Sequence, residues 1–138
     1  MPRIELLSWE AARPHAAPIR FDVFVKEQGV PRDIELDEMD AQSVHALAFE
    51  GEAAVATGRL LPDGHIGRMA VLAAWRGRGL GGLVLRRLLD KARERGDTEV
   101  VLSAQVQALG FYRRHGFVEE GAPFMEAGIL HQAMRRAP

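Results

Sequence analysis

The sequence predicts a mixed α+β fold with a strand–helix–strand unit near its centre. Three observations predict it: short apolar runs separated by turn residues in residues 44–71, a long amphipathic pattern in residues 80–95, and a further apolar run directly after that pattern. The chain has 138 residues, and no internal repeat, low-complexity tract or long Pro/Gly/Ser-rich linker divides it. We therefore expect a single domain that spans residues 1–138.

The first half of the chain predicts a strand, a short helix and an antiparallel meander. Residues 4–7 form an apolar run suited to a strand, and residues 19–25 carry apolar side chains at helical spacing until Gly29 and Pro31 end the pattern. Three β-like runs follow at residues 44–49, 53–61 and 65–71. The segments between these runs, residues 50–52 and 62–64, have the composition of hairpin turns, so an antiparallel arrangement is the simplest interpretation.

The second half predicts one long helix among shorter elements. The apolar positions of the helix share one face: Leu80, Leu83, Val84, Leu88 and Ala92. Gly96 stands where a helix of this length would end. After it, residues 99–102 predict a strand, residues 104–114 a second helix, and residues 117–118 and 129–134 strand-like pieces.

The composition argues against several classes of partner. With 18 basic and 19 acidic residues the formal net charge is -1, which gives no basic field for nucleic acid. The chain has no cysteine, which excludes disulfides, thiolate zinc sites and a cysteine nucleophile and fits a reducing compartment. No segment approaches the roughly 20 apolar residues of a membrane span. We expect a cytoplasmic protein with no membrane or nucleic-acid partner.

Glycines gather at residues 77–82, between a β-like run and the long helix. Glycine permits positive φ and close approach of a ligand, and the free amides of a helix N-terminus favour an anion. Arg76 and Arg78 add positive charge, so the turn suits a phosphate or pyrophosphate group. A dinucleotide fold is a weaker interpretation, because the motif lies past the middle of the chain and Glu99 begins the next strand instead of ending it. No Lys-Ser or Lys-Thr follows, which excludes a P-loop, and glycine for packing alone is the remaining alternative.

Two separated motifs resemble the GNAT acyltransferases. Residues 76–81, Arg-Gly-Arg-Gly-Leu-Gly, match the Q/R-x-x-G-x-G/A signature of that family, and residues 108–117 resemble its A-x-x-x-Y-x-x-x-G-F stretch. Residues 24–28, 35–40, 102–105 and 126–131 are similar to the ElaA-like branch. The resemblance covers nearly the whole chain. It implies a mostly antiparallel, twisted sheet that splays between its fourth and fifth strands and is flanked by helices.

The resemblance also implies a cosubstrate, acetyl-coenzyme A, and a set of residues that bind it. Its pyrophosphate would lie on the glycine turn, formed by Arg76, Gly77, Arg78, Gly79, Leu80, Gly81 and Gly82. Its pantetheine arm would pair with the fourth strand at Met69, Ala70 and Val71 as an added strand. Gln105 stands where many members carry Asn, seven residues before the family tyrosine.

The implied reaction is direct attack of a neutral primary amine on the acetyl thioester. Tyr112, the only tyrosine, stands at the family position that faces the coenzyme A sulfur, and a phenol that stays protonated at neutral pH can protonate the thiolate. The backbone amide of Val71 is the candidate oxyanion donor. For the general base we rank Glu27 first, then His131, then His45. Each of these residues has a structural alternative. Tyr112 could be a core tyrosine, Glu27 a solvated surface acid, and His131 and His45 hydrogen-bonded structural histidines.

Residues 33–40 are rich in acid, which has two interpretations. The carboxylates could attract a cationic acceptor, or they could belong to a solvated loop or short turn. A calcium loop counted from Asp33 would need Gly at Glu38 and Glu at Val44, and no pair of the five histidines has metal-ligand spacing, so we expect no metal.

Two other functions stay open at the level of sequence. The first is a GNAT-shaped module that binds or senses coenzyme A without transfer, and the second is a non-acyl nucleotide-binding protein. Neither the acceptor amine nor the oligomeric state follows from the sequence, although homodimers are common in the family that it resembles.

Overall fold

A mixed sheet forms the centre of the computed structural model, which describes residues 2–138 apart from the side chain of Ile34. Its strands are β1 (Arg3–Leu7), β2 (Val44–Glu50), β3 (Ala53–Leu60), β4 (His65–Val71), β5 (Val100–Gln105), β6 (Val118–Glu119), β7 (Phe124–Glu126) and β8 (Ile129–Arg136). The strand order is β1-β2-β3-β4-β5-β8-β6, and β7 pairs with β8. All of these pairs are antiparallel except β4–β5, so the predicted α+β fold with a mostly antiparallel sheet is confirmed.

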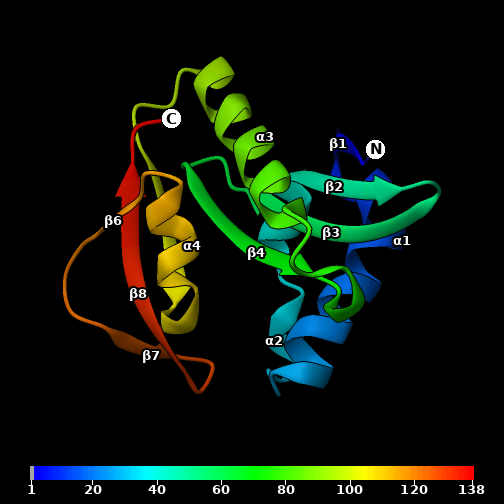
Figure 1. Ribbon diagram of the computed structural model, residues 1–138, viewed down its shortest axis with the longest axis horizontal. Helices are drawn as coiled ribbons and strands as arrows, with labels where there is room; N and C mark the ends of the chain where they lie inside the picture. The colour runs from blue at the N-terminus through cyan, green and yellow to red at the C-terminus, as the bar shows by residue number, and fades with distance from the viewer. Residues whose placement is uncertain (1) are drawn as a thin grey trace.

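Helices cover both faces of the sheet. They are α1 (Trp9–Arg20), the π-helix η1 (Phe21–Glu27), α2 (Arg32–Glu35), the 3-10 turns η2 (Glu38–Gln42), η3 (Ala73–Trp75) and η4 (Val106–Ala108), α3 (Leu80–Arg95) and α4 (Leu109–Arg114). Figure 1 shows α3 on one face of β2 and β3 and α1 on the other. Each face has its own apolar core, around Val84 and Leu88 of α3 and around Ala12 and Ala16 of α1. None of the described helices has both the length and the apolar composition that a bilayer crossing requires.

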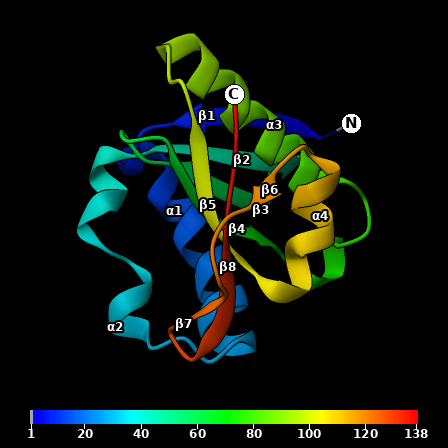
Figure 2. The same cartoon turned by 90° about the vertical axis from the view of Figure 1, so that its left-hand side faces the viewer.

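The sheet splays open between β4 and β5. These strands pair only at His65↔Val101 and Ile66↔Leu102. Beyond that point β4 stays with β3, while β5 pairs with β8 as far as Gln105. Figure 1 shows β4 running away from β8, and Figure 2 shows β5 and β8 side by side. The C-terminal half of β4 therefore has an open edge in the middle of the sheet, and it faces the open edge of β5 beyond Leu102.

A β-bulge lies at the start of this open edge. Thr57 pairs with Ala70 but Arg59 pairs with Gly67, so one residue of β3 faces two residues of β4. Arg68 is in the left-handed region, with φ 51°. The opposing residue is Gly58, where an added Cβ would lie 2.4 Å from Met69 Sδ. Glycine is therefore needed at this position for β3, β4 and α3 to pack together.

The N-terminal helix is longer than predicted. Residues 19–25 are its second half, and it starts at Trp9 with two prolines inside it. Proline normally ends or kinks a helix. Here the small and apolar side chains at Ala12, Ala16, Ile19 and Val23 are all buried against the sheet, so tertiary packing outweighs the loss of backbone hydrogen bonds.

Three other predicted boundaries were wrong. The predicted helix 104–114 begins at Leu109, because Ala104 and Gln105 pair with β8 as the end of β5. β7 was not predicted at all, and it is only three residues long. Residues 32–40, predicted as a loop or short turn, contain the short helix α2 and the start of the 3-10 turn η2.

Candidate active site

A cleft of about 1110 Å³ opens where β4 and β5 separate. The walls come from β4, β5, β8, η1 and α4, which are elements from both halves of the chain. Most of the residues that the sequence singled out for chemistry line it, namely Glu27, Met69, Ala70, Val71, Arg76, Gly81, Gln105, Tyr112 and His131. The splayed sheet thus brings together residues that are up to 104 positions apart in the chain (from Glu27 to His131).

At one end of the cleft, the turn before α3 presents free backbone amides. Gly77 and Gly79 have φ of 81° and 79°, which a side chain would strain. The helix's first bond runs from the Leu83 amide to the Gly79 carbonyl, 3.2 Å, so the amides before Leu83 have no helical acceptor. With the dipole of this 16-residue helix behind them, these amides form a site for an anion.

The next two glycines have a packing role. Added Cβ atoms would lie 3.5 Å from the Phe111 ring at Gly81 and 3.2 Å from His115 Nε2 at Gly82. The distance at Gly82 is tight, whereas 3.5 Å at Gly81 is ordinary van der Waals contact. Gly82 therefore packs closely against the end of α4, while Gly77 and Gly79 shape the turn.

The open edge of β4 carries unpaired backbone groups. The Leu72 amide donates to the Val55 carbonyl of β3, 3.0 Å. Because successive backbone groups of a strand point to opposite edges, the amide and carbonyl of Val71 point away from β3, into the cleft. Arg76 Nε donates to this Val71 carbonyl, 3.0 Å, in agreement with that direction.

Tyr112 lies on α4 with its side chain almost fully buried. Phe111 and Phe117 contact its ring edge-on, with centroid distances of 5.0 and 5.9 Å. Burial raises the pKa of the Tyr112 phenol to about 12. The hydroxyl is therefore neutral throughout the physiological range and can donate a proton.

His131 lies on β8 with 7% of its surface exposed. Its Nδ1 is 2.7 Å from the Ile129 carbonyl oxygen, an acceptor, so a neutral ring has its proton on Nδ1 and a lone pair on Nε2. Nε2 is 3.8 Å from Glu126 Oε2, and Phe124 stacks on the ring with centroids 6.0 Å apart. The ring is held in one orientation, with its basic nitrogen next to a carboxylate.

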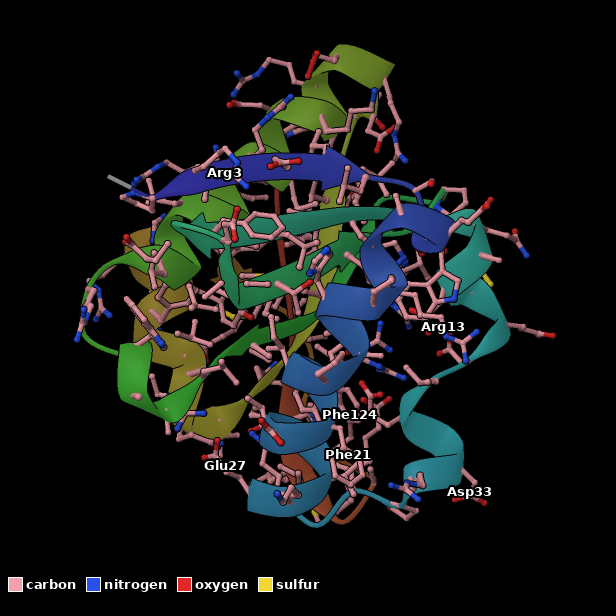
Figure 3. The ribbon with its side chains drawn as sticks, turned by 90° about the vertical axis from the view of Figure 1, so that its right-hand side faces the viewer. Arg3, Arg13, Phe21, Glu27, Asp33 and Phe124 are labelled. Atoms are coloured by element: carbon pink, nitrogen blue, oxygen red, sulfur yellow. The ribbon has the colours of Figure 1, made fainter. Side chains whose placement is uncertain are left out.

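Glu27 and Gln28 reach across the cleft from the end of η1. Glu27 accepts two hydrogen bonds from Arg76, at 2.9 and 2.7 Å, and these lower the pKa of its carboxyl. Gln105 Nε2 donates to Gln28 Oε1, 2.8 Å. Figure 3 shows α1 and η1 crossing in front of the sheet, with Glu27 at the lower end of that helix. The helix is thus tied both to the glycine turn and to β5.

His45 and the acidic segment lie apart from this centre. His45 is buried on β2, with Nε2 2.9 Å from the Asp40 carbonyl oxygen, and it does not line the cleft. Glu35, Asp37 and Asp40 form ion pairs with arginines, so the solvated-loop interpretation was wrong for them. Asp33 is exposed at the outer side of α2 (Figure 3). Among residues 2–138, no group of three or more His, Cys, Asp or Glu side chains is arranged to hold a metal ion.

Comparison with known proteins identifies the family. Residues 12–137 match the family described as acetyltransferase (GNAT) domain. The chain is also 38% identical over 122 residues to the uncharacterized N-acetyltransferase YjcF of Bacillus subtilis (strain 168), an alignment that covers 86% of this chain and 87% of YjcF. The chain belongs to the GNAT acetyltransferase family.

Solved structures of GNAT proteins have the same fold. An acyl-CoA N-acyltransferase from Pseudomonas aeruginosa superposes with a TM-score of 0.88 at 31% identity, over 99% of this chain and 100% of that one. ElaA of Escherichia coli superposes with a TM-score of 0.87 at 28% identity, over 99% of both chains. The resemblance to ElaA inferred from sequence is confirmed. As a GNAT acetyltransferase, the protein is an enzyme, and its family implies an acyl-CoA donor.

Sequence reasoning missed three residues of this GNAT cleft. Gln28 and Glu126 were inside segments that resembled ElaA, yet neither belongs to a motif with its own chemistry. Arg68 lines the cleft because the bulge turns it there, and no sequence pattern distinguishes it from other surface arginines. Contacts with segments distant in the sequence indicate a role for Arg68 and Gln28, and proximity to His131 across the β7–β8 hairpin indicates one for Glu126.

Proposed function

We propose that the protein transfers an acetyl group from acetyl-coenzyme A to a primary amine, by direct attack and without a covalent enzyme intermediate. The carrying observation is the cleft that joins Arg76 and Gly81 of the glycine turn, the open edge of β4, Tyr112 and His131. The turn would bind the pyrophosphate, and β4 would pair with the pantetheine arm through Met69, Ala70 and Val71. When bound, acetyl-coenzyme A supplies the activated thioester carbonyl.

Each residue around that carbonyl would stabilise a developing charge or transfer a proton. The amine nitrogen forms a bond to the carbonyl carbon, and the C–S bond then breaks. The Val71 amide stabilises the oxyanion between these steps. Tyr112 gives its proton to the departing sulfur, since its phenol is neutral at physiological pH and still carries that proton.

His131 is the better-supported base for the amine proton. It is buried in the cleft with its basic nitrogen oriented, whereas Glu27 is exposed and its carboxylate is occupied by Arg76. A carboxylate whose pKa is lowered by a cation is a weaker proton acceptor. We therefore place His131 ahead of Glu27, in reverse of the order inferred from sequence, and assign Glu27 to closing the cleft.

A titration and a turnover assay test the function together. Calorimetry with acetyl-coenzyme A should give 1:1 binding, and release of free thiol should depend on an added amine from a panel of amino acids, amino sugars, diamines and peptides. Binding with no amine-dependent thiol release would favour a coenzyme A sensor. Absence of binding, or tighter binding of NAD, would contradict the acetyltransferase proposal.

A further inference from the structure

The bulge in β4 places an arginine side chain on the wall of the cleft. Arg68 adopts φ 51°, a conformation that a non-glycine residue rarely takes unless its surroundings hold it there. Its Nε donates to the Glu35 carbonyl, 3.0 Å, and its Nη2 to Asp37 Oδ2, 3.2 Å. The side chain keeps 28% of its surface exposed and lines the cleft. A strained backbone thus fixes a cation in the space left for the acceptor.

Arg68 belongs to a network of three arginines and three carboxylates. The others are Arg20, Arg59, Glu35, Asp37 and Asp40, and Arg20, Glu35, Asp40 and Arg59 are all at most 5% exposed. The network holds α1, α2 and η2 against β3 and β4. Its formal charges balance, so charge alone does not say what ligand it would take.

The hydrogen-bond capacity of the network indicates which charge a ligand of this site would carry. Each carboxylate oxygen of Asp37 and Asp40 already accepts two hydrogen bonds: Asp37 from Met39, Arg59 and Arg68, and Asp40 from Arg20, Arg59 and Asp37. An acceptor's ammonium group would find these oxygens occupied. Among the described residues, Arg59 Nε is a buried donor with no partner. Glu35 Oε1 accepts one hydrogen bond, from Arg20 Nε, so the fully occupied oxygens are those of Asp37 and Asp40, and the unpartnered buried atom beside them is a donor.

The electrostatic surroundings of Arg68 also favour a negatively charged ligand. Burial lowers the pKa of its guanidinium, and the nearby charges of Arg59 and Arg20 lower it further. An anion at the exposed part of this side chain would relieve both effects, because it supplies an opposite charge and acceptor atoms in a partly desolvated place. Asp37 and Asp40 therefore do not present a site for a cation; they orient arginines.

We propose that the acetyl acceptor is a primary amine that also carries a carboxylate or phosphate group, and that this group binds at Arg68, with the more deeply buried Arg59 adding charge. The amine would then lie towards Tyr112 and His131 in the same cleft. This inference rests on the proposed acetyltransferase function and names the class of its acceptor.

Matched acceptors test the proposal directly. Ethanolamine, phosphoethanolamine, β-alanine and putrescine are compared as acceptors by kcat/KM, because they differ mainly in the group opposite the amine. We expect phosphoethanolamine, β-alanine or both to exceed ethanolamine and putrescine by about tenfold or more. The two anionic arms distinguish phosphate from carboxylate. Equal turnover of ethanolamine and the anionic amines, or preference for putrescine, would overturn the proposal.

Variants of Arg68 test whether this residue causes the preference for anionic acceptors. Arg68→Gln should reduce the anionic preference to within about twofold, with ethanolamine turnover changed much less. Arg68→Gly removes the guanidinium and also accepts the positive φ, so it covers the case in which Arg68→Gln misfolds. Arg135→Gln is the control, since Arg135 is 51% exposed and pairs with Glu99 and Glu120 instead of lining the cleft. A preference unchanged in both Arg68 variants would contradict the assignment.

A binding measurement separates this proposal from the proposed function. If acetyl-coenzyme A binds but no amine is acetylated, the transferase function fails while the anion site is still testable. Inorganic phosphate and acetate are then titrated into the protein saturated with coenzyme A, which occupies the glycine turn. Binding that Arg68→Gln abolishes would support the anion site, and no binding of either ion would refute it.

Discussion

The surroundings of Tyr112 set the protonation state of the proposed general acid. Two aromatic rings and the cleft wall bury the phenol and raise its pKa to about 12, so it is protonated whenever a thiolate leaves. We predict that Tyr112→Phe lowers kcat by about a hundredfold and leaves the dissociation constant of acetyl-coenzyme A unchanged, because only the proton is removed. Steady-state kinetics and calorimetry measure the two quantities. Equal turnover by the variant would exclude Tyr112 as the acid.

His131 and Glu27 can be distinguished by the same substitution at each. His131→Gln should lower kcat by about a hundredfold, because the proposed proton acceptor is removed. Glu27→Gln removes one charge of the ion pair with Arg76 and should raise KM while kcat changes little. The reverse pattern in steady-state kinetics would restore Glu27 as the base.

Gly58 is required because no space is left beside it. A Cβ would meet Met69 Sδ at 2.4 Å and Leu88 at 3.1 Å, so we expect Gly58→Ala to lower the free energy of unfolding by about 1–3 kcal/mol. Gly67→Ala is the matched control, since nothing lies within 4 Å of its added Cβ. Urea denaturation measures both. A loss at Gly67 as large as that at Gly58 would show that crowding is not the cause.

At the scale of elements, the β7–β8 hairpin carries a residue in an unfavourable conformation. Its turn residues Ala127 and Gly128 have φ of 51° and 76°, the signs that a tight two-residue hairpin requires. Asn tolerates the left-handed region better than Ala, so Ala127→Asn should stabilise the protein by about 0.5 kcal/mol. Thermal unfolding checks this, with the exposed Ala137→Asn as control, and a lower Tm for Ala127→Asn would contradict it.

The helix from Trp9 to Glu27 has a second function besides packing. Its first half fills the core of one face, and its end bridges the cleft through Glu27–Arg76 and Gln28–Gln105. This element therefore connects the glycine turn to β5 across the cleft.

At the scale of the whole molecule, buried charges make stability depend on pH. The hydrogen bond from Arg59 lowers the pKa of Asp37 below 3.8, and burial lowers that of His45 below 6.5. Both groups bind fewer protons folded than unfolded, so their stabilisation is present above those values and is lost as pH falls. We expect the free energy of unfolding to fall from about pH 6.5 downwards and again below about pH 4.

Denaturant titrations at pH 8, 5 and 3 measure that profile. His45→Gln keeps a hydrogen-bonding side chain but does not titrate, so it should remove the loss between pH 8 and 5 and keep the loss at pH 3. A variant that loses as much stability as the natural protein between pH 8 and 5 would show that His45 is not responsible.

The fold was largely predictable because its main signals are local. The meander between residues 44 and 71 and the helix α3 are each defined by periodicity and turn residues within a few positions. The helix α1 was missed because burial of its small side chains overrides two prolines. The end of β5 was misassigned because its pairing with β8 is not visible in its own residues.

The sequence by itself determined the family, the glycine turn and the candidate role of Tyr112, because each depends on residues that are neighbours in the chain. Only the tertiary structure showed that Glu27 and His131 line the cleft while His45 does not, what the acidic segment pairs with and where Arg68 points. Those properties depend on contacts such as Glu27–Arg76 and Gln28–Gln105, whose partners are 49 and 77 residues apart. The strength and direction of a charge–charge contact follow from distance and burial, which exist only once the chain has folded.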